Sequence, residues 1–364
     1  MKQVTKLLIA TILCVVTIFS FAAFSGCSNG NDKELNDIKA KLEEIEKKNA
    51  ETEKKLKEAE DNAKKALERL ESLTIGGTDN IDYRLSDDGT YYIATGPVED
   101  CTDTVFEIAT LYKGLPVKEI AESAFAGLNE ENVGKGEATC VIKNVTIPSS
   151  VTYIGKKAFE NDSQLAYVYF GGAVDGGDEV LSGCTSLTQV TISEGTKRIP
   201  NGFFRNLTGM VKCVLPEGLE EIGDGAFFNC CNQNFSINIP STVKKICFAA
   251  FWNAIYTNFE TFPADTVEYI GAEAFFYCVR AKFPNIKFGS QLKFIGAKAF
   301  YLHLGEYTIE FEQTDGWYYT SDENADATTE GSIAIKLEGD CKELLYKYSS
   351  EEEGCLGEYY FKHD

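Results

Sequence analysis

Histidine is nearly absent from this sequence, and its absence restricts the chemistry that the chain can carry. Only two histidines occur among 364 residues, His303 and His363. No Ser/His/Asp or Cys/His arrangement can be assembled from them, so nucleophilic catalysis lacks its usual base. His303 also falls at a repeat position that other repeats fill with Cys, Leu or Ala, which indicates a structural side chain. We therefore expect a protein that is not an enzyme and needs no cofactor.

Basic charge is also scarce, and this restricts the partners. The chain has 35 Lys and Arg against 56 Asp and Glu, a net charge of −21 and a pI near 4.6. This balance argues against nucleic acid and against charge-driven binding to anionic membranes. It favours partners that are neutral or basic, or that are bridged by cations. Asp322, Asn324 and Asp326 imitate the start of a calcium loop, but Ala327 and Ile333 replace the required Gly and Glu, so we expect no metal site.

What the sequence does contain is a repeat, seen in LPEGLEEIGDGAF from Leu215 to Phe227. Its final aromatic recurs at intervals of 22 to 25 residues, apart from one interval of 34, and Leu181 fills the one gap. An isoleucine stands five positions before every recurrent aromatic. The recurrent aromatics are Phe125, Phe159, Phe204, Phe227, Phe251, Phe275 and Phe300. A period in the twenties predicts a solenoid whose units must stack to bury their apolar faces.

Each repeat also carries an apolar L-x-x-L-x-L pattern, for example Leu187, Val190 and Ile192. This pattern predicts one strand per coil of 22–25 residues, in a parallel sheet that runs through about eight coils. A glycine such as Gly223 follows the recurrent isoleucine in several repeats, which indicates a close approach of the backbone that a side chain would forbid. The recurrent Phe is then expected to fill the coil interior and to stack on the Phe of the next coil.

These motifs resemble the BspA-like leucine-rich-repeat proteins of bacterial surfaces. The signature of that family can be written IPxxVxxIGxxAFxxC followed by LxxIxI, and residues 145–159 (VTIPSSVTYIGKKAF) and 263–278 (PADTVEYIGAEAFFYC) match it nearly throughout. The resemblance covers roughly residues 80–312, and it implies a leucine-rich-repeat solenoid with an N-terminal cap. Aromatic, strand-like pieces in residues 310–364 indicate a C-terminal cap of antiparallel strands, since the last apolar face of a solenoid must be covered. The chain departs from the family pattern at two places. The 159–181 unit lacks the Ile and the Gly, and an acidic insertion occupies residues 129–137.

The first 27 residues predict an export signal. Lys2 and Lys6 precede an apolar run from Leu7 to Phe24, which ends close to Cys27. The segment resembles a bacterial lipoprotein signal in which Cys27 is acylated, although an uncleaved membrane helix is the alternative, because about twenty apolar residues can span a bilayer. Both interpretations place the rest of the chain outside the cytoplasm, anchored to the membrane.

Residues 33–73 read as heptads. Ten of their twelve a and d positions are apolar, and Asn49 and Thr52 are the exceptions. The g and e′ positions pair Lys with Glu, which favours a parallel coiled coil, either dimeric or trimeric. A single solvated helix held by local Glu and Lys pairs is the alternative. Either form makes an α-helical stalk about 60 Å long.

The domain plan follows from these segments. We expect a signal peptide (1–27), a spacer and coiled-coil stalk (28–77), an N-terminal cap (78–117), leucine-rich repeats (118–309) and a C-terminal cap (310–364). Cys184, Cys230 and Cys278 occupy one repeat position in alternate coils, over about 9 Å apart, so they cannot form disulfides with one another. Cys341 and Cys355, outside the repeats, are the one pair that could form a bridge.

The resemblance implies a surface-displayed adhesion or capture module for a protein or glycan, and the alternative is a structural lipoprotein of the cell envelope. A binding patch needs outward aromatic or apolar side chains on the strands. The candidates are Tyr167, Tyr169, Val214, Phe235 and Phe259. The simpler interpretation is that such residues only stabilise the sheet, and that Phe259 points inward because its coil is irregular.

Overall fold

The computed structural model describes residues 32–71, 73–135, 140–301, 306–320, 324, 328–329, 332–341, 345 and 360–363. The expected signal segment 1–27, with Cys27, lies outside these residues. The chain divides into two compact units, Met1–Arg69 and Leu70–Asp364. In the described part of the chain, no helix is both long and apolar enough to cross a membrane.

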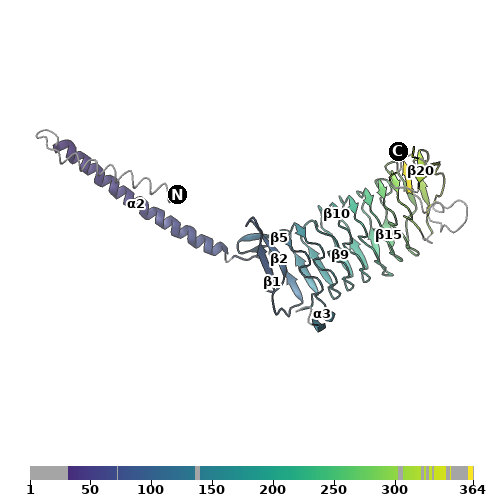
Figure 1. The fold of residues 1–364 in the computed structure, drawn as a ribbon, viewed down its shortest axis with the longest axis horizontal. Coiled ribbons are helices and arrows are strands. Elements are labelled where there is room, and N and C mark those ends of the chain that lie inside the picture. Colours follow the sequence, from purple (N-terminus) through teal and green to yellow (C-terminus); the bar gives the residue numbers. More distant parts are fainter. Residues whose placement is uncertain are drawn as a thin grey trace. The chain divides into compact units, whose positions relative to one another are not determined.

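Helix α2 (Asp32–Glu71) is the element described in the first unit (Figure 1). It contains no Gly or Pro and is rich in Ala, Leu, Glu and Lys, the residues with the highest helix propensity. Acidic residues lie four positions before lysines, and the Nζ–carboxylate distances are 2.7 Å for Lys48–Glu44 and 2.8 Å for Lys55–Glu51. The predicted helix is thereby confirmed, whereas the coiled coil stays a prediction. Ile45, on the expected seam, is exposed in the single chain.

The second unit is a solenoid whose coils each place one strand in a parallel row, which we call the long-strand row (Figure 1). The described residues contain nine of these strands, so the solenoid has about nine turns rather than the eight predicted. They are β3 (Val105–Glu107), β6 (Asn144–Ile147), β8 (Tyr167–Phe170), β9 (Gln189–Thr191), β11 (Lys212–Val214), β13 (Ser236–Asn238), β15 (Asn258–Thr261), β17 (Ile286–Phe288) and β19 (Ile309–Phe311).

A second parallel row, the short-strand row, contains the recurrent isoleucines. Its members are β5 (Leu115–Ile120), β7 (Tyr153–Ile154), β10 (Arg198–Ile199), β12 (Glu221–Ile222), β14 (Lys245–Ile246), β16 (Tyr269–Ile270) and β18 (Phe294–Ile295). The prediction of one strand per coil was therefore wrong. Most of these strands have two residues, too few for an alternating pattern to be recognised in the sequence. The unit that lacks the Ile has only an isolated bridge between Ile154 and Gly176.

The recurrent phenylalanines form the core between the two rows, as predicted. All of them are fully buried, and Leu181 fills the gap between Phe159 and Phe204. Successive rings stack, with centroid distances of 5.0 Å for Phe204–Phe227 and 5.4 Å for Phe251–Phe275. The rise from coil to coil, about 4.8 Å between paired strands, matches the thickness of a stacked aromatic pair, so the same contact can repeat along the solenoid.

Antiparallel strands extend the sheets at both ends of the solenoid. At the N-terminal end, β1 (Ile81–Leu85) pairs with β2 (Tyr92–Pro97), and β2 leads into the short-strand row. β4 (Leu111–Tyr112) pairs with β5, and Ile75 forms a bridge with Leu111. Hydrogen bonds to Leu73 and Ile75 tie this segment to residues 110–114, so the folded solenoid unit includes residues before the predicted boundary at 78.

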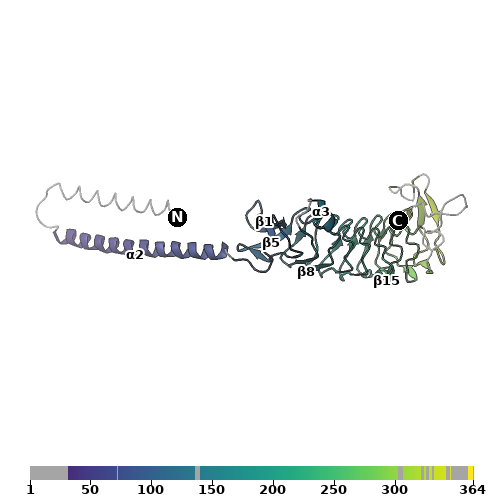
Figure 2. The ribbon, with the colours of Figure 1, turned by 90° about the horizontal axis from the view of Figure 1, so that it is seen from below.

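At the C-terminal end, three strands continue the short-strand row beyond β18 (Figure 2). β22 (Tyr360–His363) pairs with β18, β20 (Trp317–Thr320) with β22, and β21 (Ile333–Ile335) with β20. The indole of Trp317 is buried against Phe311, with ring centroids 5.3 Å apart. The sequence predicts antiparallel strands after the repeats, and their role as a C-terminal cap stays a prediction. Within the acidic insertion, α3 (Glu130–Lys135) is capped by Asn129, whose Oδ1 accepts from the Asn132 N–H at 3.0 Å.

Candidate functional site on the long-strand row

Side chains alternate between the core and the solvent along β8, and this alternation presents two tyrosines outward. Tyr167 and Tyr169 are 52% and 51% exposed, whereas Val168 and Phe170, between and after them, are buried. Val214, on β11, is 37% exposed. The outward orientation predicted for these three candidates is confirmed.

The same prediction was wrong for the other two candidates. Phe235 and Phe259 are each only 1% exposed. Phe259 pairs with the inward Ile237, next to an irregularity in the register between β13 and β15. It stacks on Phe283 at 4.3 Å, so it is a core residue, as the simpler interpretation held.

The coil that contains Phe235 explains the first of these errors. Phe235 lies two residues before the inward Ile237, whereas the core residue Met210 lies three residues before Cys213, which pairs with Ile237. Because side chains alternate with a period of two, a shift of one position within the L-x-x-L-x-L pattern reverses the side on which a residue lies. The large apolar ring of Phe235 takes the inward position, 6.3 Å from the Phe227 ring, since burial of such a ring contributes about 1.5–3 kcal/mol.

The outward residues that flank Tyr167 and Tyr169 on the two neighbouring strands are uncharged. On one side, the paired residues are Asn144 opposite Tyr167 and Thr146 opposite Tyr169. On the following strand, β9, the outward residues are Gln189 and Thr191. We call Asn144, Thr146, Tyr167, Tyr169, Gln189 and Thr191 the tyrosine patch. A neutral surface with two exposed aromatic rings and several hydroxyl and amide groups is suited to a protein or glycan ligand.

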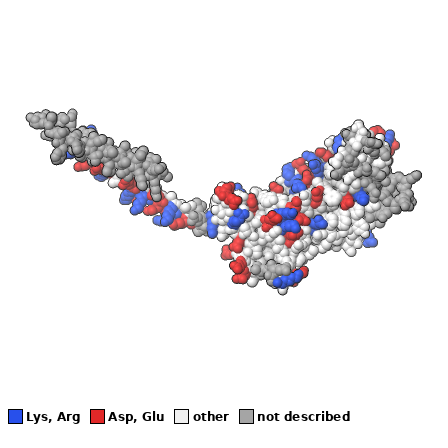
Figure 3. All heavy atoms as spheres, viewed as in Figure 1, with Lys and Arg blue, Asp and Glu red and all other residues white. Residues whose placement is uncertain are grey.

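Some charged side chains elsewhere on the repeats form ion pairs with one another. Figure 3 shows acidic and basic side chains interspersed along the repeat region, with broad uncharged areas between them. Beside the short-strand row, Glu220 accepts from Lys197 and Lys244, and both N–O distances are 3.1 Å. Hydrogen bonds from these lysines lower the pKa of the Glu220 carboxyl. Arg198 and Glu221 form a further pair at 2.6 Å. These contacts join successive coils and stay exposed to solvent, so each contributes little to stability.

Three cysteines of the repeats are core residues. Cys184, Cys230 and Cys278 are fully buried, and each thiol donates to the carbonyl oxygen of the recurrent phenylalanine in the preceding coil, with S–O distances of 3.1 Å. Burial raises the pKa of all three thiols, which disfavours the nucleophilic thiolate. Cys341 is buried, and its predicted partner Cys355 lies outside the described residues, as do His303, Asp322 and Asp326.

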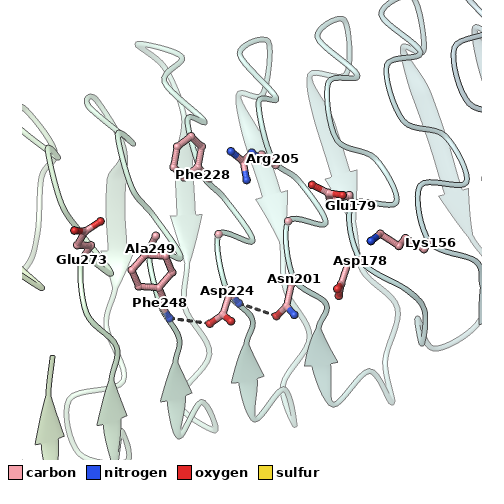
Figure 4. Close-up of a pocket in the computed structure, with 12 residues that line it drawn as sticks. Lys156, Asp178, Glu179, Asn201, Arg205, Asp224, Phe228, Phe248, Ala249 and Glu273 are labelled. Carbon is pink, nitrogen blue, oxygen red and sulfur yellow. Dashed lines mark hydrogen bonds between the residues drawn. The ribbon is translucent and has the colours of Figure 1, made fainter. Parts of the chain in front are cut away.

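A groove lies on another side of the solenoid, in the turns that follow the short strands. Its volume is about 460 Å³, and it runs across the coils from Asp178 to Glu273. Gly202, Gly225 and Ala249 are among its lining residues, and we call these three the floor. Figure 4 shows the side chains around the groove. It contains none of the five candidate residues named from the sequence.

The repeats match a known family model. The model of the BspA type leucine rich repeat region matches residues 137–258 and 250–314, in six copies. The chain belongs to the BspA-type leucine-rich-repeat family. A comparison with curated proteins found no match.

Several solved structures resemble this BspA-type chain. A leucine-rich-repeat protein of T. pallidum is 25% identical, with a TM-score of 0.47, and the match covers 56% of this chain and 89% of that one. A leucine-rich-repeat protein of Bacteroides ovatus is 23% identical, with a TM-score of 0.43, over 66% of this chain and 65% of that one. A leucine rich cell surface protein of Faecalibacterium prausnitzii is 18% identical, with a TM-score of 0.38, over 66% and 76% of the two chains.

Sequence reasoning missed the groove, although one signal pointed to it. The second residue after the recurrent isoleucine is Lys, Asn, Asp or Ala in most repeats of this BspA-type chain, but it is Phe248 in one. An aromatic residue at a position that is otherwise small or polar indicates either a packing difference or a binding surface. The Phe248 ring is 51% exposed, so packing does not explain it.

Proposed function

We propose that this chain is a surface-displayed binding module that captures a protein or glycan partner through the tyrosine patch. Leucine-rich-repeat proteins are generally interaction modules, because stacked coils present a long regular surface. The observation that carries the proposal is the pair Tyr167 and Tyr169, both more than half exposed on one strand and flanked by uncharged outward residues, in a strongly acidic protein. Tyrosine supplies a large contact area together with a hydroxyl group, and it is enriched at binding hot spots. The module acts by binding, without catalysis.

Anchorage at the bacterial cell membrane is part of the same proposal. The N-terminal segment carries Cys27 after an apolar run, the arrangement of a lipoprotein signal. Acyl chains on that cysteine, at about 0.8 kcal/mol per buried methylene, would hold the chain at the membrane. The helix α2 would then act as a stalk, and its apolar seam would join two or three copies through residues 33–73.

Capture experiments with residues 73–364 test the proposal. The fragment is applied to arrays of host matrix proteins, bacterial surface polysaccharides and short glycans, and the bound species are measured by interferometry. The double variant Tyr167→Ser/Tyr169→Ser should lose the captured partner. A matched variant, Tyr153→Ser/Tyr277→Ser, removes two exposed tyrosines outside the patch and should keep it.

Two outcomes would contradict the proposal. If the patch variant keeps its partner while the matched variant loses it, the binding site lies elsewhere on the solenoid. If no array component binds, the alternative of a structural lipoprotein that spaces or scaffolds the envelope becomes the better explanation.

A further inference from the structure

The groove exists because one row of side chains is interrupted. The third residue after the recurrent isoleucine has a positive φ in each coil, between 50° and 60°. These residues are Ser123, Lys157, Gly202, Gly225, Ala249, Glu273 and Lys298, together with Glu179, which lies three residues after Gly176 in the coil that lacks the isoleucine. In three consecutive coils the row therefore ends at the backbone or at a Cβ atom, whereas Glu179 and Glu273 project on either side. The missing side chains leave the groove open in these coils, and the carboxylates of Glu179 and Glu273 lie at its two ends.

The walls of the groove differ in character. Figure 4 shows Asn201, Asp224 and Phe248 along one side and Arg205 and Phe228 along the other. Asn201 Oδ1 accepts from the Asp224 N–H at 2.9 Å, and Asp224 Oδ1 accepts from the Phe248 N–H at 3.0 Å. These side chains tie each coil to the next. The Phe248 side chain has no hydrogen-bond acceptor, so it cannot bond to the backbone N–H of the next coil as Asn201 and Asp224 do. Its exposed ring therefore does not tie the coils together in this way.

The two aromatic rings are presented differently. Phe228 has both faces covered, because Trp252 stacks on it at 4.5 Å and the Arg205 guanidinium lies 4.3 Å from its centroid. It therefore offers an edge to the groove. Phe248 stacks on no other ring in the described part of the chain. Its face is free to receive an apolar or cationic side chain.

The charge of the groove favours a cation. Asp178, Glu179, Asp224 and Glu273 line it, against the basic residues Lys156 and Arg205. Glu179 shares Lys157 with Glu160, and the Lys157–Glu179 distance is 3.5 Å. The net charge of the chain, −21, adds a long-range attraction for basic partners.

We propose that the groove binds an extended peptide segment in which Lys or Arg residues flank apolar ones. The apolar side chain would contact Phe248 above the floor of Gly225 and Ala249, and the cations would meet the carboxylates at the two ends. Glu179 and Glu273 are four coils apart, about 19 Å at the usual strand spacing. Five residues of extended chain span about 17 Å, so a pentapeptide fits between them.

The test uses the full chain purified in detergent and the fluorescein-labelled pentapeptide Lys-Leu-Lys-Leu-Lys, with fluorescence anisotropy as the readout. The main variant is Ala249→Glu. Glu179 and Glu273 show that this row accepts Glu at a positive φ, so the variant should fold. The added negative charge would favour the basic peptide, whereas the added side chain blocks the floor of the groove. We expect the affinity for the peptide to fall by at least about tenfold, or 1.4 kcal/mol. Ala173→Glu adds the same charge at an exposed alanine outside the groove and should leave the affinity unchanged.

Two further variants identify the contacts. Phe248→Ala should weaken binding, and Glu273→Gln should weaken it by about threefold at low salt and less at high salt. The variant Tyr167→Ser/Tyr169→Ser should bind the peptide normally, which separates this site from the tyrosine patch. Tighter binding by Ala249→Glu would show that only overall charge attracts the peptide and would overturn the proposal. The proposal would also be wrong if an oligosaccharide, rather than the peptide, bound in a manner that Ala249→Glu abolished.

Discussion

The rings of Phe227 and Phe251 lie face to face, with centroids 5.0 Å apart and planes inclined by 2°. Both side chains are fully buried. The centroid distance is close to the spacing of paired strands, so each ring repeats the contact of the ring before it. The stability of one coil therefore depends directly on the packing of its neighbours, as expected of a solenoid.

Phe227→Ala should leave a cavity in the middle of this stack and lower the free energy of unfolding by about 3–5 kcal/mol. Denaturant unfolding followed by circular dichroism measures the loss. Phe248→Ala removes the same side chain from an exposed position and is the control, with an expected change within about 0.5 kcal/mol. Equal effects of the two substitutions would show that the stack does not stabilise the solenoid.

Tyr167→Ser/Tyr169→Ser should leave the melting temperature nearly unchanged, because both rings point to solvent. Phe235→Ser should lower it strongly, because it puts a hydroxyl group and a cavity in place of a ring that is 1% exposed. Thermal unfolding of the two proteins side by side tests the assignment. A stable Phe235→Ser protein would mean that the ring is not part of the core.

Gly271→Ala should destabilise the chain by about 1–3 kcal/mol, since an added Cβ would lie 2.5 Å from the Phe248 nitrogen and 2.6 Å from the Cys247 carbonyl carbon. The backbone atoms of the preceding coil cannot move aside cheaply. Gly134→Ala, in α3, is the matched control, because nothing lies within 4 Å of its added Cβ. It should be neutral or slightly stabilising. A neutral Gly271→Ala would mean that the coils can separate there without cost.

Asp162 should make the stability fall as pH rises. Its carboxyl is buried, Oδ1 accepts from the Leu128 N–H at 2.7 Å, and Oδ2 has no partner. Burial raises the pKa of Asp162 well above its usual value. Between about pH 3.9 and the raised pKa, the folded chain keeps a proton on Asp162 that the unfolded chain releases. The free energy of unfolding therefore falls as the pH rises through this range. Asp162→Asn should remove this dependence, measured as melting temperature from pH 4 to pH 8. An unchanged pH profile would assign the dependence to other groups.

Helix α2 should associate through its exposed seam. In sedimentation equilibrium at tens of micromolar, residues 28–364 should form dimers or trimers, whereas residues 73–364 should stay monomeric. Ile45→Lys places a charge on the seam, where Ile45 is 47% exposed in the single chain, and should dissociate the oligomer. Identical monomer masses for the two lengths would leave α2 as a single helix, held by pairs such as Lys48–Glu44.

The core of the solenoid could be predicted from the sequence because it is periodic. Phe227 and Ile222 recur in every regular coil, and a residue that recurs at the coil period must occupy the same place in a stack. The close approach at glycines such as Gly223 and the burial of Cys230 followed from the same alignment. The heptads of α2 likewise predicted a helix, since local propensity and periodicity agree there.

Only the tertiary structure decided what depends on contacts between coils. Strands of two residues, such as β12, exist through pairing with their neighbours and have no pattern of their own. The inward positions of Phe235 and Phe259 follow from a local register that composition does not reveal. Gly202, Gly225 and Ala249 are 23 and 24 residues apart in the sequence, and they form one groove floor because stacking brings each coil within about 5 Å of the next.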